Sequence, residues 1–459
     1  MKFAFFCIPA HGHTNPMLPV AAELCRRGDE VRFYSFAPFA EKIRATGAEF
    51  VSCDAYLAEL TEREEKKLKA VSITEMTVQA IRCTLAMDAF LDAEFKAFSP
   101  DVVYTDSACF WGKLNAWKHG VPMVVSTSTF AFNQLSSQYM KHSAGELADL
   151  IFGLLRVKKE LKKLEPYGYH IKSALRLVTS DNQTESVVYT SKRFQPFSAS
   201  FSDRYLFAGP SVFSDAVPNK DKARPLVYIS MGTVINDRPD LYARCIEALR
   251  AENVDVLISC GSAVDVGSLG VLPENVRVLP CVDQLDVLAH ADVFLTHCGM
   301  NSVSESLYMA TPMLLYPQTG EQQAVARRAA ELGAGVLLKD DSAEGIRAAV
   351  REVLGCAAYA DAAKACSDDF RACCGAAGAA DFLESAPNET NGVDPMREFN
   401  RANGRFRIAY RLCFTAVIVL FGTLVGWRYA WILGVLGGLL STPLANRVMR
   451  KKYAELEGR

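Results

Sequence analysis

The chain begins with the stretch Phe3-Ala-Phe-Phe-Cys-Ile-Pro-Ala-His-Gly-His-Thr-Asn-Pro16. Its first six residues are apolar, as is typical of a strand buried on both faces of a parallel sheet. A turn follows at once, and Asn15 with Pro16 is a common start of a helix, with asparagine as N-cap and proline in the first turn. The stretch therefore predicts a strand, a turn and a helix, with the turn outside the carboxyl end of the strand, where open α/β sheets bind ligands.

The same alternation of short apolar runs and helical patterns continues along the chain and is interrupted once. A polar, proline-containing segment, residues 209–224, separates two stretches of similar length. We therefore expect two Rossmann-like α/β domains, residues 1–208 and 225–385, that face each other across a ligand-binding cleft. Buried strands are predicted at residues 3–8, 31–36, 102–105 and 122–126, and then at 226–230, 254–259, 276–279, 293–296 and 313–316.

Composition narrows the class of protein. A chain of 459 residues is too long for one compact core. The net charge of −2 gives no electrostatic reason to expect a nucleic-acid partner. The 14 cysteines are scattered, which favours reduced thiols in a cytosolic protein. The first apolar run is too short for a signal peptide, so we expect the catalytic part in the cytoplasm.

The C-terminal segment has a different composition. After a polar tether, residues 386–404, come two stretches without charged residues, 412–427 and 429–446, with only Arg428 between them. Arginines and lysines flank this pair on both sides, which predicts that both ends lie in the cytoplasm. We therefore expect residues 405–459 to form a hydrophobic helical hairpin that anchors the protein to the cytoplasmic face of the cell membrane. A soluble helical hairpin packed on the catalytic domains is the alternative.

Two residues that follow predicted strands form the first candidate constellation. His13 follows the first strand, and Asp106 ends the strand at 102–105, so both side chains emerge at the same edge of one sheet. A carboxylate bonded to one ring nitrogen fixes the histidine tautomer and raises the basicity of the other nitrogen. The alternatives are a loop histidine that caps a turn and an aspartate that caps the helix containing Trp111.

The second constellation lies at residues 291–305, where a strand, a glycine turn and the start of a helix follow one another. Free backbone N–H groups and the helix dipole make such a junction a site for anions. His297, Asn301 and Ser302 can add donors to a phosphate. Ser302 with Glu305 also fits a capping box, which would use both side chains within the helix.

Both stretches resemble the UDP-glycosyltransferases of the macrolide-type branch of glycosyltransferase family 1, which have the two-Rossmann GT-B fold. The resemblance covers roughly residues 1–385 and leaves the C-terminal segment unmatched. It is carried by Ala-His-Gly-His-x-Asn-Pro at residues 10–16, Ser-Met-Gly-Thr at 230–233 and Thr-His-x-Gly-x-Asn-Ser-x-x-Glu at 296–305.

The resemblance implies a role for each matching residue. His13 would be the general base and Asp106 its partner, while the remaining residues would bind the donor. These are Thr233, His297, Gly299, Asn301 and Ser302 at the diphosphate, Glu305 at the ribose, Gln284 at the uracil, and Glu321 and Gln322 at the sugar.

Three positions depart from the pattern of the family. Cys281 stands where an aromatic residue usually lies against the base, and Asp283 stands in place of a proline, which leaves both uridine and thymidine donors open. Glu321 replaces the usual aspartate, so glucose cannot be assumed as the sugar.

We therefore predict an inverting glycosyltransferase that moves a sugar, with a hexose expected, from a UDP-sugar to a hydroxyl of a macrolide-, sterol-, polyphenol- or lipid-like acceptor. Neither metal nor cofactor is expected, since the chain has no Asp-x-Asp triplet and the helix N-terminus can neutralise the diphosphate. Segments 61–98 and 130–169, where we expect the acceptor to bind, carry no motif that identifies it. The competing hypotheses are a nucleotide-sugar epimerase and a membrane-tethered protein that only binds a lipophilic ligand.

Overall fold

The computed structural model describes residues 1–57, 60–62, 64, 68, 72–133, 135–140, 144–169, 171, 184–212, 216–233 and 235–386. The predicted hairpin, residues 405–459, and nearly all of the tether before it lie outside these residues. Within the part that is described, no helix is both long and apolar enough to cross a membrane.

The first unit is built on a sheet of seven parallel strands in the order β3-β2-β1-β4-β5-β6-β7. Strand β1 (Lys2–Phe6) is apolar and buried after Lys2, because it lies inside the sheet between β2 and β4 and is covered on both faces. The other strands are β2 (Glu30–Ser35), β3 (Glu49–Ser52), β4 (Val102–Asp106), β5 (Met123–Thr127), β6 (Glu185–Val188) and β7 (Tyr205–Phe207). The helices are α1 (His11–Arg27), α2 (Ala40–Arg44), α4 (Ile73–Phe98), α5 (Phe110–His119) and α6 (Ala144–Lys162), with short 3-10 turns that include η3 (Ser136–Tyr139) and η4 (Glu165–Tyr167).

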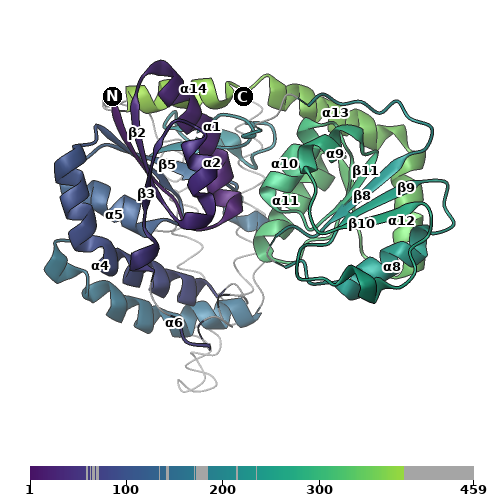
Figure 1. The fold of residues 1–459 in the computed structure, drawn as a ribbon, viewed down its shortest axis with the longest axis horizontal. Helices are drawn as coiled ribbons and strands as arrows, with labels where there is room; N and C mark the ends of the chain where they lie inside the picture. The colour runs from purple at the N-terminus through teal and green to yellow at the C-terminus, as the bar shows by residue number, and fades with distance from the viewer. Residues whose placement is uncertain are drawn as a thin grey trace, which may run out of the picture.

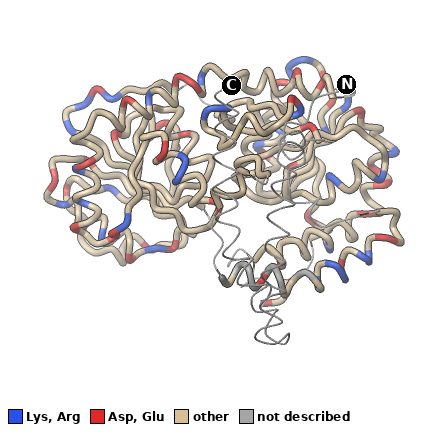
Figure 2. The backbone as a smooth tube through the Cα atoms, turned by 180° about the vertical axis from the view of Figure 1, so that it is seen from behind, with Lys and Arg blue, Asp and Glu red and all other residues tan. Residues whose placement is uncertain are grey.

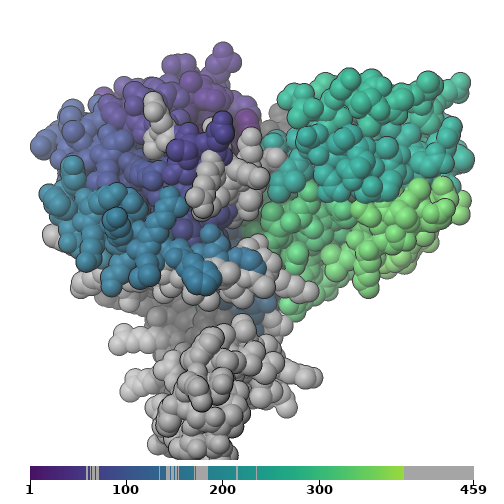
Figure 3. Space-filling view, turned by 90° about the horizontal axis from the view of Figure 1, so that it is seen from below, coloured from purple at the N-terminus to yellow at the C-terminus, as the bar shows by residue number. Residues whose placement is uncertain are grey.

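The second unit repeats this plan with six parallel strands in the order β10-β9-β8-β11-β12-β13. Its strands are β8 (Leu226–Ser230), β9 (Asp255–Ser259), β10 (Val276–Leu279), β11 (Val293–Thr296), β12 (Met313–Leu315) and β13 (Gly335–Leu337). Its helices are α8 (Pro239–Leu249), α9 (Gln284–His290), α10 (Met300–Tyr308), α11 (Gly320–Glu331), α12 (Ala343–Gly355) and α13 (Ala357–Arg371). Figures 1 and 3 show the two units as two lobes side by side, and Figure 2 shows charges of both signs spread over them.

The last described helix, α14 (Gly375–Ser385), returns to the first unit. Ala379, Ala380 and Leu383 are buried in the same core as strand β1, and Arg27 of α1 pairs with Asp381 at 2.6 Å. The predicted second domain, residues 225–385, thus ends with eleven residues that pack on the first unit. Periodicity marks a helix but not the sheet that it covers, so the sequence could not show this crossing.

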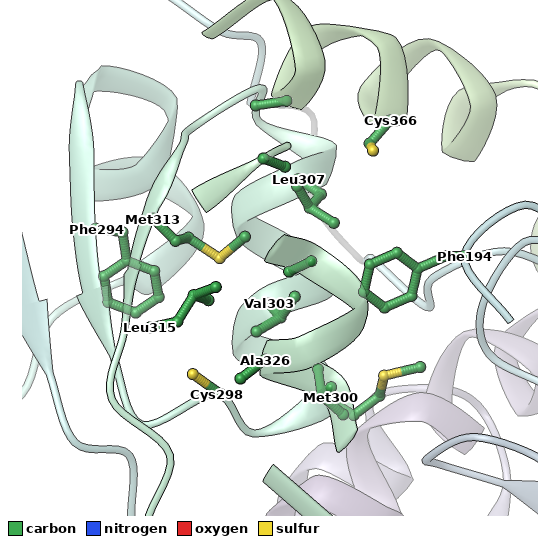
Figure 4. Close-up of a cluster of buried hydrophobic side chains, with 14 of the residues drawn as sticks. Phe194, Phe294, Cys298, Met300, Val303, Leu307, Met313, Leu315, Ala326 and Cys366 are labelled. Atoms are coloured by element: carbon green, nitrogen blue, oxygen red, sulfur yellow. The ribbon is translucent and has the colours of Figure 1, made fainter. Parts of the chain in front are cut away.

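Apolar side chains of both units meet around α10. In Figure 4, Val303 and Leu307 of this helix lie between Phe294 of strand β11, on the left, and Phe194 of the first unit, on the right. Tyr139 of η3 belongs to the same buried cluster. Its hydroxyl donates to Glu331 of α11 at 2.6 Å. The units are therefore joined by a dry core with a polar contact, and α10 is fixed relative to the first sheet.

Candidate active site

Each sheet has a position where its strand order reverses, and the predicted site residues follow the strands at these positions. In the first sheet the reversal lies between β1 and β4. Strand β1 precedes His13, and strand β4 ends in Asp106. In the second sheet it lies between β8 and β11, which precede Thr233 and His297. Such switch points leave a crevice beyond the strand ends, where open α/β sheets bind ligands.

His13 and Asp106 are joined as the sequence predicts. Nδ1 of His13 lies 2.8 Å from Oδ2 of Asp106, and the other oxygen of this carboxylate accepts from the backbone N–H of Ala108 at 2.9 Å. Asp106 is fully buried, whereas 30% of the His13 side chain is exposed. The helix with Trp111 begins at Phe110 without a side-chain cap, so the alternative interpretation, in which Asp106 caps that helix, is wrong.

A third residue, Ser128, completes this group and was not predicted. Its hydroxyl oxygen lies 3.1 Å from the same Nδ1 of His13. Ser128 follows strand β5, the neighbour of β4, so the rule that points to strand ends would also have found it. With Nδ1 held from two sides, Nε2 is the ring nitrogen that can take a proton from a ligand.

The prediction that Asn15 caps the first helix is wrong, because α1 begins four residues earlier, at His11. Pro16 therefore lies inside the helix, where it has no N–H to donate to the carbonyl of Gly12. Asn301 of the second unit donates to that carbonyl at 3.2 Å. The proline thus leaves the Gly12 carbonyl free to accept from Asn301, and this bond joins the first turn of α1 to the start of α10.

The electrostatic surroundings of His13 have opposing effects on its pKa. Burial by itself lowers the pKa, whereas the charge and the hydrogen bond of Asp106, with a smaller contribution from the charge of Glu321, raise it. The net result is a raised pKa. Glu321 is an exposed residue in the first turn of α11, so a residue of the second unit influences the basicity of a residue of the first.

The start of α10 is free to bind a ligand. Its N-cap is Gly299, which has no side chain to accept from the first N–H groups of the helix. Ser302 is therefore the third helical residue and not the cap, and the capping box proposed for Ser302 and Glu305 is wrong. In the described part of the chain no side chain caps these first N–H groups, so they and the helix dipole can bind an anion.

His297 lies beside this helix start in a space that only glycines leave open. A Cβ at Gly232 would lie 2.5 Å from the His297 ring, and one at Gly299 would lie 2.6 Å from it. Nδ1 of His297 is buried with no hydrogen-bond partner in the described part of the chain. Burial lowers the pKa of His297 to about 4, although the backbone of Ser230 opposes this shift, so near neutral pH the ring is uncharged and carries one N–H.

Gln284 and Glu305 face each other next to this helix start. The amide nitrogen of Gln284 donates to Glu305 at 2.5 Å and lies 3.3 Å from the hydroxyl of Ser302. Burial, reinforced slightly by the charge of Asp283, raises the pKa of Glu305 to about 7 although the Gln284 contact opposes it. Asp283 itself caps α9 by accepting from two backbone N–H groups, which explains an aspartate at that position.

The remaining predicted residues surround this group less closely. Thr233 is exposed in the turn after β8, next to the position where the strand order of the second sheet reverses. Gln322 is part of a capping box with Thr319, and its amide oxygen accepts from the backbone N–H of Gln318 at 2.8 Å. Only the NH₂ group of Gln322 can therefore reach a ligand. Cys281, where an aromatic residue was expected, is exposed.

No cluster of residues suited to hold a metal ion occurs among the described residues. The thirteen cysteines in this part of the chain are all free, and Cys281, Cys356 and Cys374 are exposed.

Comparison with known proteins identifies the family. Residues 215–368 match the family described as UDP-glucoronosyl and UDP-glucosyl transferase. The chain is 29% identical over 403 residues to an uncharacterized UDP-glucosyltransferase of Bacillus subtilis, covering 84% of this chain and 98% of that protein. It is 31% identical over 346 residues to the demethyllactenocin mycarosyltransferase of Streptomyces fradiae, covering 72% of this chain and 74% of that protein.

A solved structure shows the same architecture. The glycosyltransferase of kitacinnamycin superposes with a TM-score of 0.71 at 26% identity and covers 84% of this chain and 98% of its own length. The two parallel sheets thus form the GT-B fold expected from the sequence. The chain belongs to the UDP-glucuronosyl and UDP-glucosyl transferase family, and is a glycosyltransferase that moves a sugar from a nucleotide-sugar donor to an acceptor.

Proposed function

We propose that this enzyme glycosylates a hydroxyl of a lipophilic acceptor by direct, inverting displacement, with His13 as general base. The observation that carries the proposal is the contact between the two switch points. The His13–Asp106 pair lies on the first unit, the open start of α10 lies on the second, and the bond from Asn301 to Gly12 joins them.

The reaction needs an acceptor oxygen that becomes nucleophilic. Nε2 of His13 takes the hydroxyl proton as the oxygen attacks the anomeric carbon of the sugar. Asp106 and Ser128 hold Nδ1 and so fix the ring, and Asp106 also stabilises the imidazolium that forms. The new bond forms on the face opposite to the leaving group, so the anomeric configuration inverts.

The bond from the anomeric carbon to the diphosphate breaks in the same step, and its electron pair leaves with the nucleoside diphosphate. The backbone donors at the start of α10, the neutral ring of His297, and Asn301, Ser302 and Thr233 neutralise the charge on the phosphates. No metal is required for this task. Unpaired donors near a helix start are most useful when a charged group arrives, because nothing has to be displaced from them.

We further propose that Glu305 and Gln284 bind the nucleoside and that Glu321 and Gln322 contact the sugar. A carboxylate accepts well from the two hydroxyls of a ribose, and Gln284 already orients Glu305. We expect UDP as the nucleotide and a hexose as the sugar. Thymidine donors are the alternative, because Cys281 offers no ring for the base to stack on.

The proposed domains follow this division. Residues 1–208 bind the acceptor, residues 225–385 bind the donor, and residues 209–224 connect them. We also propose that residues 405–459 form a membrane hairpin, which keeps the catalytic units at the cytoplasmic face, where a lipophilic acceptor collects.

The test is to incubate the full-length enzyme with labelled UDP-glucose, and separately with labelled dTDP-glucose, together with a total lipid extract. We expect a labelled product whose new glycosidic bond is β when the donor is α-linked, as NMR of the purified product would show. A product that retains the α configuration would exclude direct displacement. An epimerised nucleotide sugar without any transfer would favour an epimerase.

A further inference from the structure

The helix α6 carries an apolar surface on the side that faces away from the protein. Phe152 is 81% exposed and Leu155 is 79% exposed, and these residues lie almost one turn apart on the same side. Among the described residues only two other large apolar side chains are more than half exposed, Val217 and Val271, and neither lies in a helix or strand. We call the sector formed by Phe152, Leu155, Lys158, Lys159 and Lys162 the outer face of α6.

Close packing on α4 fixes which side of α6 points outward. A Cβ at Gly153 would lie 2.0 Å from the hydroxyl of Thr74, so this helix approaches α4 as closely as only glycine allows. Val157 is buried on the same side. Arg156 donates to the buried carboxylate of Glu75 at 2.6 Å. The helix cannot rotate to hide Phe152 and Leu155 without breaking these contacts.

The charges on α6 divide in the same way. Lys158, Lys159 and Lys162 are exposed on the outer face. Glu160 is buried and pairs with Lys163 at 2.7 Å. In Figure 2, α6 runs along the lower edge of the molecule and carries several blue segments. The outer face thus combines exposed apolar side chains with positive charge, although the whole chain has a net charge of −2.

We propose that the outer face of α6 docks on an anionic phospholipid bilayer. Apolar side chains next to lysines are the features by which a helix lies in a bilayer interface, with the rings and aliphatic chains at the acyl boundary and the ammonium groups among the headgroup phosphates. Contact with water alone would leave the apolar surface of Phe152 and Leu155 exposed. An acidic partner protein would account for the three lysines but not for the apolar pair beside them.

The sequence beyond the described residues supports this choice of partner. Residues 412–427 and 429–446 have no charged side chain, and the proposed hairpin there would give a second attachment to the same membrane. One shallow interfacial contact gives marginal, reversible binding, whereas two contacts together give stable binding. Docking of α6 would also set the orientation of the first unit, which the hairpin alone, behind a polar tether, leaves free.

The experiment uses the full-length protein with p-benzoylphenylalanine at one position, Phe152→p-benzoylphenylalanine. The protein is irradiated with vesicles of phosphatidylcholine alone or with added phosphatidylglycerol, and adducts are identified by mass spectrometry. Val271, which is 99% exposed on the second unit, is the matched control position. We expect phospholipid adducts at position 152 and none at 271, with about threefold more adduct when phosphatidylglycerol is present. Lys159→Glu with Lys162→Glu should lower the yield about tenfold.

Three outcomes would overturn the proposal. Adducts between position 152 and a peptide from residues 412–446 would show that this chain covers the outer face itself. Equal yields at positions 152 and 271 would show random collision with lipid. Loss of turnover on a water-soluble acceptor, without vesicles, in Phe152→Ser and Leu155→Ser would show that the pair lines the acceptor site. The two adduct readouts do not depend on the proposed catalytic roles, because the adducts form with or without sugar transfer.

Discussion

The two switch points of this molecule have the same strand arrangement but differ in how their polar groups are hydrogen-bonded. At the first, the polar groups are already paired, because Asp106 and Ser128 both hold the ring of His13. At the second, α10 begins without a side-chain cap, and Nδ1 on the buried ring of His297 has no partner among the described residues. A base must have its tautomer set before the reaction, whereas an anion site works best when its donors wait unpaired for the charge. This difference is what we would expect if, as proposed, the first half activates the acceptor and the second half holds the leaving group.

The largest effect is expected when His13, the proposed base at the first switch point, is removed. His13→Ala should lower kcat about a hundredfold or more, with little change in donor affinity, because the base acts on the acceptor proton in the transition state. Steady-state kinetics with UDP titration by calorimetry would measure both quantities.

The control variant keeps the ring and removes its partner. Asp106→Asn should cost less than His13→Ala, and the double variant should be no worse than His13→Ala alone, since the carboxylate acts through the ring. If His13→Ala keeps most of its activity, His13 has no part in the mechanism. If the double variant is much slower than either single variant, the two residues act separately.

The next largest effect is expected at the second switch point, where we propose that the donor binds. Glu305→Ala should raise the KM for the donor about tenfold and lower kcat less, because hydrogen bonds from the ribose to a carboxylate are lost in ground state and transition state alike. Glu344→Ala, at an exposed position of α12, is the control and should change neither constant. Thermal unfolding with and without UDP completes the test. A loss of stability without loss of UDP-induced stabilisation would assign Glu305 to the structure alone.

A smaller effect is expected on the pH dependence of kcat, which tests whether Glu321 of the second unit influences the pKa of His13 in the first. The pKa of His13 is raised, and the base must be unprotonated, so kcat should fall as the pH falls through this raised pKa. Glu321→Gln removes a negative charge that contributes to the raised pKa and should move this acidic limb to lower pH. Asp106→Asn should move it further. The pKa of His297, about 4, lies too low to add a limb near neutral pH.

The pH dependence of donor binding should differ from that of turnover. The pKa of Glu305 is about 7, so its carboxylate is lost as the pH falls through that value, and the KM for the donor should rise. Glu305→Gln should remove this rise and leave the limb of kcat in place. If one substitution shifts the pH dependence of both kcat and the KM for the donor, the two profiles do not report His13 and Glu305 separately.

The sequence predicted most of this site because parallel strands bring their carboxyl ends to one edge. His13, Asp106 and His297 were found in this way, each at a strand end next to a reversal of strand order. What escaped prediction depends on contacts across the fold. The bond from Asn301 to Gly12 requires that Pro16 lie inside α1, and the capping box of Gln322 competes with the contact to the sugar that we propose for this residue. The position of α14 was missed because an alanine-rich helix fits either sheet.

The smallest expected effect concerns the charge of the leaving diphosphate, where a metal ion is the usual alternative to protein donors. If the start of α10 and the neutral ring of His297 supply the neutralisation, EDTA should leave turnover within about twofold, because the helix dipole and its free N–H groups are unaffected by chelation. The assay compares initial rates in EDTA, in EDTA with excess magnesium, and in untreated buffer. The sharper comparison is made in His297→Ala, whose donor site lacks one N–H. Magnesium should partly restore turnover in this variant and leave the parent enzyme unchanged, which would locate the missing charge at the second switch point. Strict dependence of the parent enzyme on magnesium would contradict the idea that the unpaired donors of this half of the molecule are sufficient.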